Sequence, residues 1–286
     1  MPDVRPTVRQ RRLGLELRQL RHDRGWTLEE AATRLERSVS ALSKLETGRQ
    51  RLRPRDMPFI LDQYGLSDSG KREDLIRLAR RAADKNWWQE YAGVVKDPFD
   101  DYLSLESEAT AIDVFASLLV PGVLQTQAYA RSVVEASREW QTAEQVERFV
   151  ELRMARQRAL TRDHPLNIWA ILTEQVLRQH IGGRDVMRRQ LDGMVQTATD
   201  LPHVVLQVLP YDCGAHAGLD GSFTLLRFGG SGPDVACINA LTSTIHLEQD
   251  SEVSRYATTF DHLKSIAQSP RASLSIIRGI SKELEA

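Results

Sequence analysis

Residues 28–47 constrain the fold of this chain more than any other segment, because their pattern predicts two short helices joined by a tight turn. Thr27 and Glu30 have the spacing of a capping box, in which each side chain satisfies a backbone donor at the start of a helix. Ser38 is placed to cap the next helix. Two short capped helices in succession, with basic segments on either side, predict a helix-turn-helix.

A preceding helix, expected over 7–24 and closed by Gly25, supplies an apolar surface for this pair. Its leucines recur at i, i+4 and i+7, which is the period of a helical stripe. A small residue at Ala32 lets the two following helices cross closely. The expected core of the helix-turn-helix consists of Ala32, Leu35, Leu42 and Leu45.

The second helix of the pair exposes side chains that can read DNA without disturbing this core. Lysine donates to guanine acceptors, serine pairs with either kind of base edge, and valine contacts a thymine methyl group. The expected base contacts are Val39, Ser40, Ser43 and Lys44. The expected phosphate contacts, for which charge or a hydroxyl group suffices, are Thr27, Arg37, Thr47, Arg49, Arg51 and Arg53.

Charge is divided unevenly along the chain. Residues 1–60 hold 14 Arg and Lys against 8 Asp and Glu, a net charge of +6, while the remaining residues hold 24 against 31, a net charge of −7. A basic head on an acidic body is typical of a protein with a local, salt-sensitive contact to nucleic acid. The alternative, a helix pair that serves only as a packing element, does not account for this division.

The 286 residues are enough for two domains, each with a core of its own. The Asp97-Pro98 step and the acidic residues after it indicate a boundary near 90–105. An amphipathic helix expected near 68–86 suits either a linker or a dimer contact. We therefore expect a helix-turn-helix domain over 1–66, a connecting helix and Trp-Trp segment over 67–100, and a C-terminal domain over 101–286.

The C-terminal domain is predicted to consist of helices that cover an antiparallel or mixed sheet. Its expected role is to bind a partner or ligand. The whole chain is thus expected to be mainly α with an α+β second domain. Apolar and β-branched runs predict strands near 166–172, 204–209, 223–228 and 235–238. Helices are expected near 125–140, 143–160, 184–199 and 252–267.

The loop 212–221 is the strongest candidate for chemistry in this domain. It holds a thiol, an imidazole and two carboxylates, so a nucleophilic pair of Cys213 and His216 is one interpretation. We favour a glycine-rich connection between strands in which His216 caps or packs, because closeness in a loop does not orient a base toward a thiol. No catalytic residue is expected, and the loop residues expected to contact a partner or ligand are His216, Gly218 and Asp220.

Neither a metal nor a cofactor is expected. Cys213 and His216 supply two ligands, whereas structural zinc usually takes about four, and the loop glycines lack phosphate-loop and dinucleotide spacing. The chain has 2 Cys, which predicts reduced thiols and a cytoplasmic, nucleoid-associated protein. No apolar run approaches about 18 residues, so no membrane contact is expected.

The run LSKLETGR, at the end of the expected recognition helix, resembles the XRE-type (Cro/repressor-like) helix-turn-helix regulators. Five further segments are NWWQEYAG, YLSLESEAT, LVPGVLQTQAYAR, VELRMARQRALTRD and LPYDCGAHAGLDGSFTLLRF. They resemble the C-terminal domain of the antitoxin-like regulators of the WhiJ type, which are found in filamentous sporulating bacteria. Together these motifs cover nearly the whole chain in the expected order. The resemblance implies a dimeric transcription regulator whose C-terminal domain binds a small partner protein, often encoded next door.

Two positions depart from the XRE pattern. Leu28 stands where many members have a Gln that touches the DNA backbone or supports the recognition helix. Glu36 stands where the turn commonly has Gly. A left-handed backbone there costs a non-glycine residue about 1–2 kcal/mol, unless the turn is reshaped.

These observations predict a sequence-specific DNA-binding transcription regulator. Its expected partners are a double-stranded DNA operator, a second copy of the chain, a small partner protein and an effector of unknown identity. We expect a homodimer because specific operators usually pair two half-sites about one helical turn apart. The alternatives are an antitoxin-like interaction module, in which DNA binding serves autoregulation alone, and a hydrolase that uses Cys213 and His216.

Overall fold

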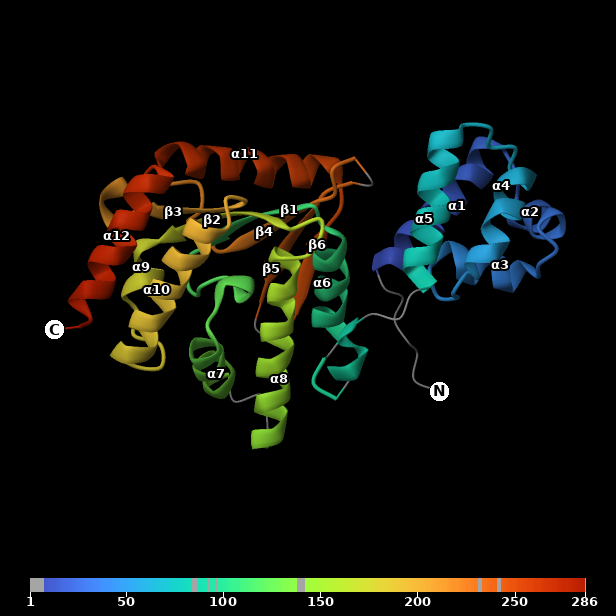
Figure 1. The fold of residues 1–286 in the computed structure, drawn as a ribbon. Helices are drawn as coiled ribbons and strands as arrows, with labels where there is room; N and C mark the ends of the chain where they lie inside the picture. The colour runs from blue at the N-terminus through green and yellow to red at the C-terminus, as the bar shows by residue number, and fades with distance from the viewer. Residues whose placement is uncertain are drawn as a thin grey trace. The chain divides into compact units, whose positions relative to one another are not determined.

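The computed structural model describes residues 8–83, 87–91, 93–95, 97–137, 142–230, 233–240 and 243–285. The chain divides into two compact units. The first comprises residues up to Glu90 together with Asp97–Leu105, and the second comprises Tyr91–Lys96 and Glu106–Ala286. In Figure 1 the helices α1 to α5 of the first unit are coloured blue to cyan, and the sheet belongs to the second unit.

The regular elements among the described residues of the first unit are all helices. Its elements are α1 (Val8–Asp23), α2 (Leu28–Arg34), α3 (Val39–Glu46), the short turn η1 (Pro54–Asp56), α4 (Met57–Gln63) and α5 (Ser69–Ala83). The short turn η2 (Trp87–Tyr91) follows, and its last residue belongs to the second unit. The three leucines of the α1 stripe share one buried cluster with residues of α2, α3, α4 and α5. The helical spacing of these leucines in the sequence therefore predicted their burial correctly.

The helix α5 belongs to this cluster. Leu75 and Ala79, about one turn apart, are buried in it, and Leu78 and Ala82 pack against it. From the sequence, this helix was expected to belong to a connecting segment over 67–100. An amphipathic helix has the same pattern whether its apolar stripe faces its own domain or a partner, so the sequence alone did not distinguish the two.

The second unit contains a sheet and helices. Its strands are β1 (Ala111–Ala116), β2 (Asn167–Thr173), β3 (Val204–Leu209), β4 (Phe223–Arg227), β5 (Val235–Asn239) and β6 (Thr244–Leu247). Its helices are α7 (Gln127–Ala136), α8 (Ala143–Arg156), α9 (Glu174–Arg178), α10 (Arg184–Asp200), α11 (Asp250–Ile266) and α12 (Pro270–Glu283), with short turns at η3 (Gly122–Leu124), η4 (Gln157–Leu160) and η5 (Tyr211–Cys213). One more helix, α6 (Asp97–Glu108), has residues in both units.

The sheet is mixed, in the order β3-β2-β1-β4-β5-β6. The strands β1, β2 and β3 are parallel, and helices occupy both crossovers, as parallel neighbours require. From β3 the chain passes to the other side of β1, where β4, β5 and β6 are antiparallel to their neighbours. The carboxyl ends of β1, β2 and β3 therefore meet the start of β4 at one end of the sheet.

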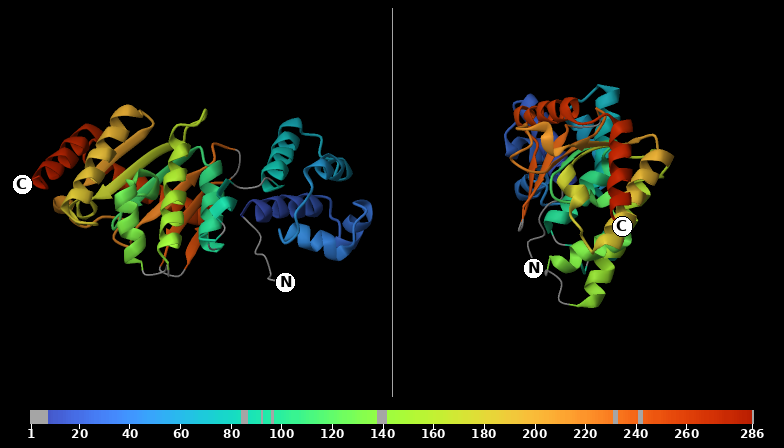
Figure 2. Two further views of the ribbon diagram at one scale, coloured as in Figure 1. Left: turned by 60° about the horizontal axis from the view of Figure 1, so that its bottom comes forward. Right: turned by 90° about the vertical axis from the view of Figure 1, so that its left-hand side faces the viewer.

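The helix α11 covers one face of the sheet, and α8 and α10 lie on the other (Figures 1 and 2). Under α11, Phe115 and Phe223 are buried together with Phe260 of the helix. The helix α12 packs against α10 and β3. Its segment also closes the outer edge of β3, because the Val208 N–H donates to Ser273 Oγ at 2.8 Å.

The expected fold class, mainly α with an α+β second domain, is confirmed. Local patterns in the sequence did not predict α6, β1, α9, β6 or α12. The apolar run 110–120, which contains β1, suits a short strand or a buried helix equally. The start of α12 has a signal in the sequence, because Ser269 Oγ accepts from the Ala272 N–H and Pro270 follows this cap. The expected ends of two helices, 84–86 and 138–140, lie outside the described residues.

Candidate nucleic-acid interface

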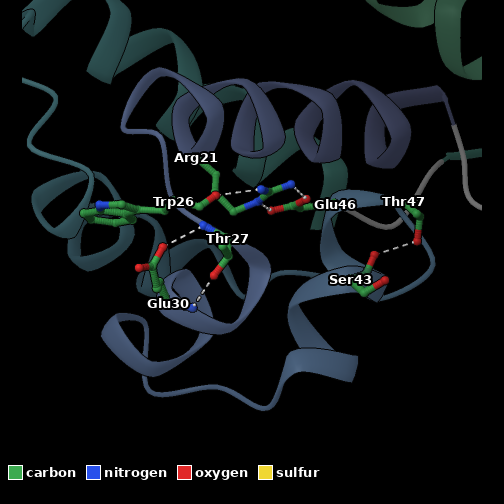
Figure 3. Close-up of polar contacts among 7 residues, drawn as sticks. All are labelled: Arg21, Trp26, Thr27, Glu30, Ser43, Glu46 and Thr47. Carbon is green, nitrogen blue, oxygen red and sulfur yellow. Dashed lines mark hydrogen bonds and ion pairs between the residues drawn. The ribbon is translucent and has the colours of Figure 1, made fainter.

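The helix α2 begins with the predicted capping box (Figure 3). The Glu30 N–H donates to Thr27 Oγ1 at 3.2 Å, and the Thr27 N–H donates to Glu30 Oε2 at 2.8 Å. The helix α3 begins at a second cap, where Ser38 Oγ accepts from the Ala41 N–H at 3.1 Å. Both caps were predicted from the sequence, and they set where each helix of the pair starts.

The turn between α2 and α3 keeps a left-handed residue that is not glycine. Glu36 has a φ of 53°. Its N–H donates to Thr33 O at 3.2 Å and the Arg37 N–H donates to Ala32 O at 2.9 Å, which together form a Schellman motif. The helices α1 and α4 end in the same way, with glycine in this position, at Gly25 and Gly65. The turn is therefore not reshaped, and Glu36 carries the strain that glycine avoids.

The predicted core of the helix pair is buried. None of its four side chains is more than 3% exposed, and the set is Ala32, Leu35, Leu42 and Leu45. These residues share one cluster with the α1 leucines. The inner face of α3 is thus fixed by packing, which leaves its outer face for another contact.

Two glycines let α3 lie directly against α1. A Cβ added to Gly14 of α1 would lie 2.5 Å from Glu46 O, and one added to Gly48, just after α3, would lie 2.8 Å from the Arg11 nitrogen. Neither distance leaves room for a side chain. This close approach was not predicted, although a glycine inside the expected helix 7–24 is a signal of it in the sequence.

A buried ion pair joins the same two helices (Figure 3). Arg21 of α1 donates through Nε and Nη2 to the two carboxylate oxygens of Glu46 at 2.7 and 2.9 Å, and through Nη1 to Trp26 O at 2.9 Å. The hydrogen bond to Glu46 raises the pKa of Arg21. This pair was not predicted from the sequence, because two charged residues 25 positions apart produce no periodic signal.

Tyr64 lies in the core beside this pair. Its side chain is 1% exposed, and its hydroxyl has no hydrogen-bond partner among the described residues. Burial, and then the negative charge of Glu46, raise the pKa of Tyr64 to about 12. The core of the first unit therefore holds the charged Arg21–Glu46 pair and, beside it, a phenol that burial keeps neutral.

Five of the predicted DNA-contact residues lie together on the outer face of α3 and just after its end. They line a hollow of about 450 Å³, and they are Ser40, Ser43, Lys44, Thr47 and Arg49. Val39, the remaining predicted base contact, does not line the hollow but is 39% exposed at the start of α3. Three hydrogen-bonding base candidates and a guanidinium thus converge on one concave surface.

The arginines predicted to contact phosphate differ in how available they are. Arg49, Arg51 and Arg53 are exposed, and no acidic side chain in the described part of the chain lies within ion-pair distance of them. Arg37, in contrast, donates through Nη2 to Asp56 at 2.8 Å. A phosphate would have to compete with that carboxylate, so the structure supports Arg37 least among the four.

The two threonines predicted to contact phosphate already make local hydrogen bonds. The hydroxyl of Thr27 accepts in the capping box. The hydroxyl of Thr47 donates to Ser43 O at 2.8 Å (Figure 3). Thr47 nevertheless lines the hollow, whereas Thr27 does not.

The predicted partner loop connects β3 to β4 and lies at the end of the sheet where β1 also ends. His216 Nδ1 accepts from the Gly218 N–H at 3.1 Å, and the imidazole meets the Phe115 ring edge-on with centroids 5.9 Å apart. Gly218 is buried so closely against Phe115 that a Cβ would overlap the ring, while Asp220 is exposed. His216 therefore closes a turn and packs, as the favoured interpretation of this loop expects.

The two cysteines have different surroundings. The Cys213 thiol donates to Gly214 O at 3.6 Å, and no hydrogen bond joins it to His216 within this fully described loop. Cys237 is buried, and this burial raises the pKa of its thiol. Across the described ranges, no group of three or more His, Cys, Asp or Glu side chains is arranged to hold a metal ion. None of the helices in these ranges has the length and apolar character needed to cross a membrane.

Comparisons with known proteins assign both parts of the chain. Residues 12–75 match the family described as a helix-turn-helix domain, and residues 99–279 match the family described as a domain of unknown function, DUF5753. No curated protein and no solved structure matches the chain. The first match supports a DNA-binding regulator. Because the second match covers more than half of the 286 residues, the chain belongs to the DUF5753 family and carries a helix-turn-helix domain ahead of that domain.

Proposed function

We propose that the chain is a dimeric, sequence-specific transcription regulator of the XRE type, whose second unit senses or binds a small partner protein. It works in the cytoplasm on the nucleoid and has no catalytic activity. The observation that carries the DNA-binding part is the hollow on the outer face of α3, where Ser40, Ser43 and Lys44 meet Arg49. The net charge of +6 over residues 1–60 supports the same assignment.

In this proposal α3 lies in the major groove. Lys44 donates to guanine acceptors, Ser40 and Ser43 pair with base edges, and Val39 contacts a thymine methyl group. Arg49, Arg51 and Arg53 hold phosphates, which fixes the register of α3 without reading sequence. The close contact of α3 with α1, through Gly14 and the Arg21–Glu46 pair, keeps the readers in one orientation.

The test begins with selection of an operator from random duplexes by the full-length chain. Lys44→Ala should then reduce the preference for the operator over a scrambled duplex by about 5- to 150-fold, the equivalent of about 1–3 kcal/mol for one base contact. Binding to the scrambled duplex should change little. Fluorescence anisotropy on both duplexes measures the two affinities.

Arg49→Ala should act differently, because a phosphate contact is independent of sequence. We expect it to weaken binding to both duplexes alike and to lower the slope of log affinity against log salt by about 1. Arg80→Ala is the matched control, since Arg80 is exposed on α5, away from the hollow. An unchanged operator preference in Lys44→Ala, together with an unchanged salt slope in Arg49→Ala, would refute the docking of α3.

Dimerisation is proposed because one helix-turn-helix domain presents few base contacts. Two such domains, bound to half-sites that lie about one helical turn (about 34–36 Å) apart, would double the number of base contacts. The selected operator should therefore be palindromic, and sedimentation should show two chains on it. A single half-site bound by one chain would contradict the dimer.

The partner-binding part rests on the similarity of the C-terminal segments to WhiJ-type, antitoxin-like regulators. A second candidate function follows from the same similarity: a protein-interaction module in which DNA binding serves autoregulation alone. Genome-wide occupancy, with and without the gene of the neighbouring small protein, separates the two. Many peaks that shift on deletion support partner-controlled regulation, whereas a single peak at its own promoter supports autoregulation. If calorimetry detects no complex between the chain and the neighbouring small protein, that result counts against both versions of partner binding.

A further inference from the structure

Exposed apolar side chains are concentrated at one end of the sheet in the second unit. Leu118 and Leu119 follow β1 and are 60% and 40% exposed, while Tyr211 and Leu219 lie between β3 and β4 and are 61% and 70% exposed. Among the described residues of this unit, one other large apolar side chain is exposed, Ile245 of β6. Scattered exposed leucines are ordinary, but a concentration of them marks an interaction surface.

Hydrogen bonds hold the loops of this surface together. The Ser117 N–H donates to Ser222 Oγ at 2.9 Å, which ties the loop after β1 to the residue before β4. The Thr173 hydroxyl at the end of β2 donates to Ser117 O at 3.3 Å. The Tyr211 N–H, after β3, donates to Glu174 Oε2 at 3.3 Å. The apolar side chains therefore stand on loops that are joined to one another.

The charges on these loops have one sign. The segments 117–126 and 210–222 contain Asp212 and Asp220 but neither Lys nor Arg, and both aspartates are exposed. Glu174, beside Tyr211, is paired with Arg178 at 2.6 Å. We call Leu118, Leu119, Tyr211 and Leu219, together with Asp212 and Asp220, the carboxyl-end surface.

This charge pattern selects among occupants. Nucleic acid would be repelled by the aspartates. A second copy of the chain, docked through the same surface, would bring four aspartates to one interface, and like charges across an interface are unfavourable. A segment that presents apolar side chains beside Lys or Arg meets both the leucines and the aspartates.

We propose that the carboxyl-end surface binds a basic, amphipathic segment of a partner protein. The leucines and Tyr211 bury the apolar side chains of that segment, and Asp212 and Asp220 pair with its cations at the rim. This inference deepens the partner-binding part of the proposed function and rests on it. It is independent of the DNA contacts of α3.

The test selects displayed random peptides, about 16 residues or four helical turns long, on the full-length chain. Enriched peptides should be amphipathic and rich in Lys or Arg, and their affinity should fall as salt is raised. Leu118→Ser with Leu219→Ser should weaken a selected peptide by at least about tenfold. Ile245→Ser is the matched control, because Ile245 is 49% exposed on another part of the same unit, and it should leave the affinity unchanged.

Asp212→Asn with Asp220→Asn provides a second variant that keeps the apolar surface. It should weaken the peptide several-fold and flatten the salt dependence. Operator binding by both double variants should equal that of the parent chain, which separates failure of this inference from failure of DNA binding. The proposal would be overturned if no peptide is enriched, if the enriched peptides are acidic, or if neither double variant changes their affinity. Loss of self-association in the leucine variant by sedimentation would assign the surface to a second copy instead.

Discussion

Glu36 shows how a single residue can keep a backbone geometry that its side chain disfavours. Its φ of 53° and the two Schellman hydrogen bonds match those at the ends of α1 and α4, where glycine is present. The exposed side chain of Glu36 gains no burial in return. The sequence predicted both the position of the turn and the cost of the residue, but not that the geometry would be kept.

Glu36→Gly should therefore stabilise the first unit. We expect a gain of about 1 kcal/mol in the free energy of unfolding, because the left-handed cost disappears while glycine loses more backbone entropy on folding. Chemical denaturation measures the change. Glu29→Gly, at a helical position of α2, is the control and should lose about 0.5–1 kcal/mol. A destabilised Glu36→Gly would show that the turn is not strained.

Tyr64 should make the first unit sensitive to alkali. Its pKa is raised from 10.0 to about 12 in the folded chain, so its contribution to stability is complete below pH 10 and is lost as pH rises from 10 to 12. A shift of about two pKa units corresponds to about 3 kcal/mol. Tyr64→Phe should remove this loss and change stability by less than about 1 kcal/mol at pH 7, because the hydroxyl has no partner among the described residues. Parallel pH-dependent unfolding of the two proteins is the measurement, and identical alkaline slopes would contradict it.

At the scale of elements, the position of α3 depends on α1 as much as on the turn. Caps and apolar spacing predicted where both helices lie in the chain, since these are local signals. The contacts between them, Gly14 against Glu46 O and the Arg21–Glu46 pair, join residues far apart in sequence. Local patterns therefore predicted the parts of the candidate interface, whereas the contacts that join α3 to α1 became visible only in the structure.

Glu46→Gln should strongly destabilise the first unit. It leaves the Arg21 charge buried without a counter-charge, for which a loss of about 3–5 kcal/mol is typical. Arg21→Met combined with Glu46→Leu should recover most of that loss, since an apolar pair needs no desolvation of charge. Thermal unfolding followed by circular dichroism measures both proteins.

An exposed pair in the same unit gives the control for that substitution. Asp74 and Arg77 of α5 form an ion pair in which both side chains are about half exposed. Asp74→Asn should change stability by less than about 1 kcal/mol, because solvent screens exposed charges. Equal losses in Glu46→Gln and Asp74→Asn would mean that burial does not set the strength of the Arg21–Glu46 pair.

For the whole molecule, the two buried clusters predict two unfolding events. One cluster belongs to α1–α5, and the other lies between the sheet and α11. Glu46→Gln should shift one calorimetric transition, and Gly218→Ala, which places a methyl group against Phe115, should shift only the other. A single transition moved by both substitutions would show that the units unfold together.

The sequence predicted the composition of the second unit better than its topology. Strand periodicity identified β2, β3, β4 and β5, but strand order depends on contacts between distant segments. The place of β1 at the centre of the sheet has no local signature. The position of the loop 210–222 at the carboxyl ends of the parallel strands follows from that order, so the exposed apolar surface there could not be inferred from the sequence.

The central place of β1 also bears on how the chain is made. Contacts within the first unit are complete once about 105 residues have been synthesised, whereas Asp113 of β1 meets Arg227 of β4 across 114 positions. At about 5–20 residues per second, ribosomes need roughly 5–20 s to cover that distance. During this interval a nascent chain carries a complete helix-turn-helix unit and an unfinished sheet, so under the proposed function contact with DNA precedes partner binding.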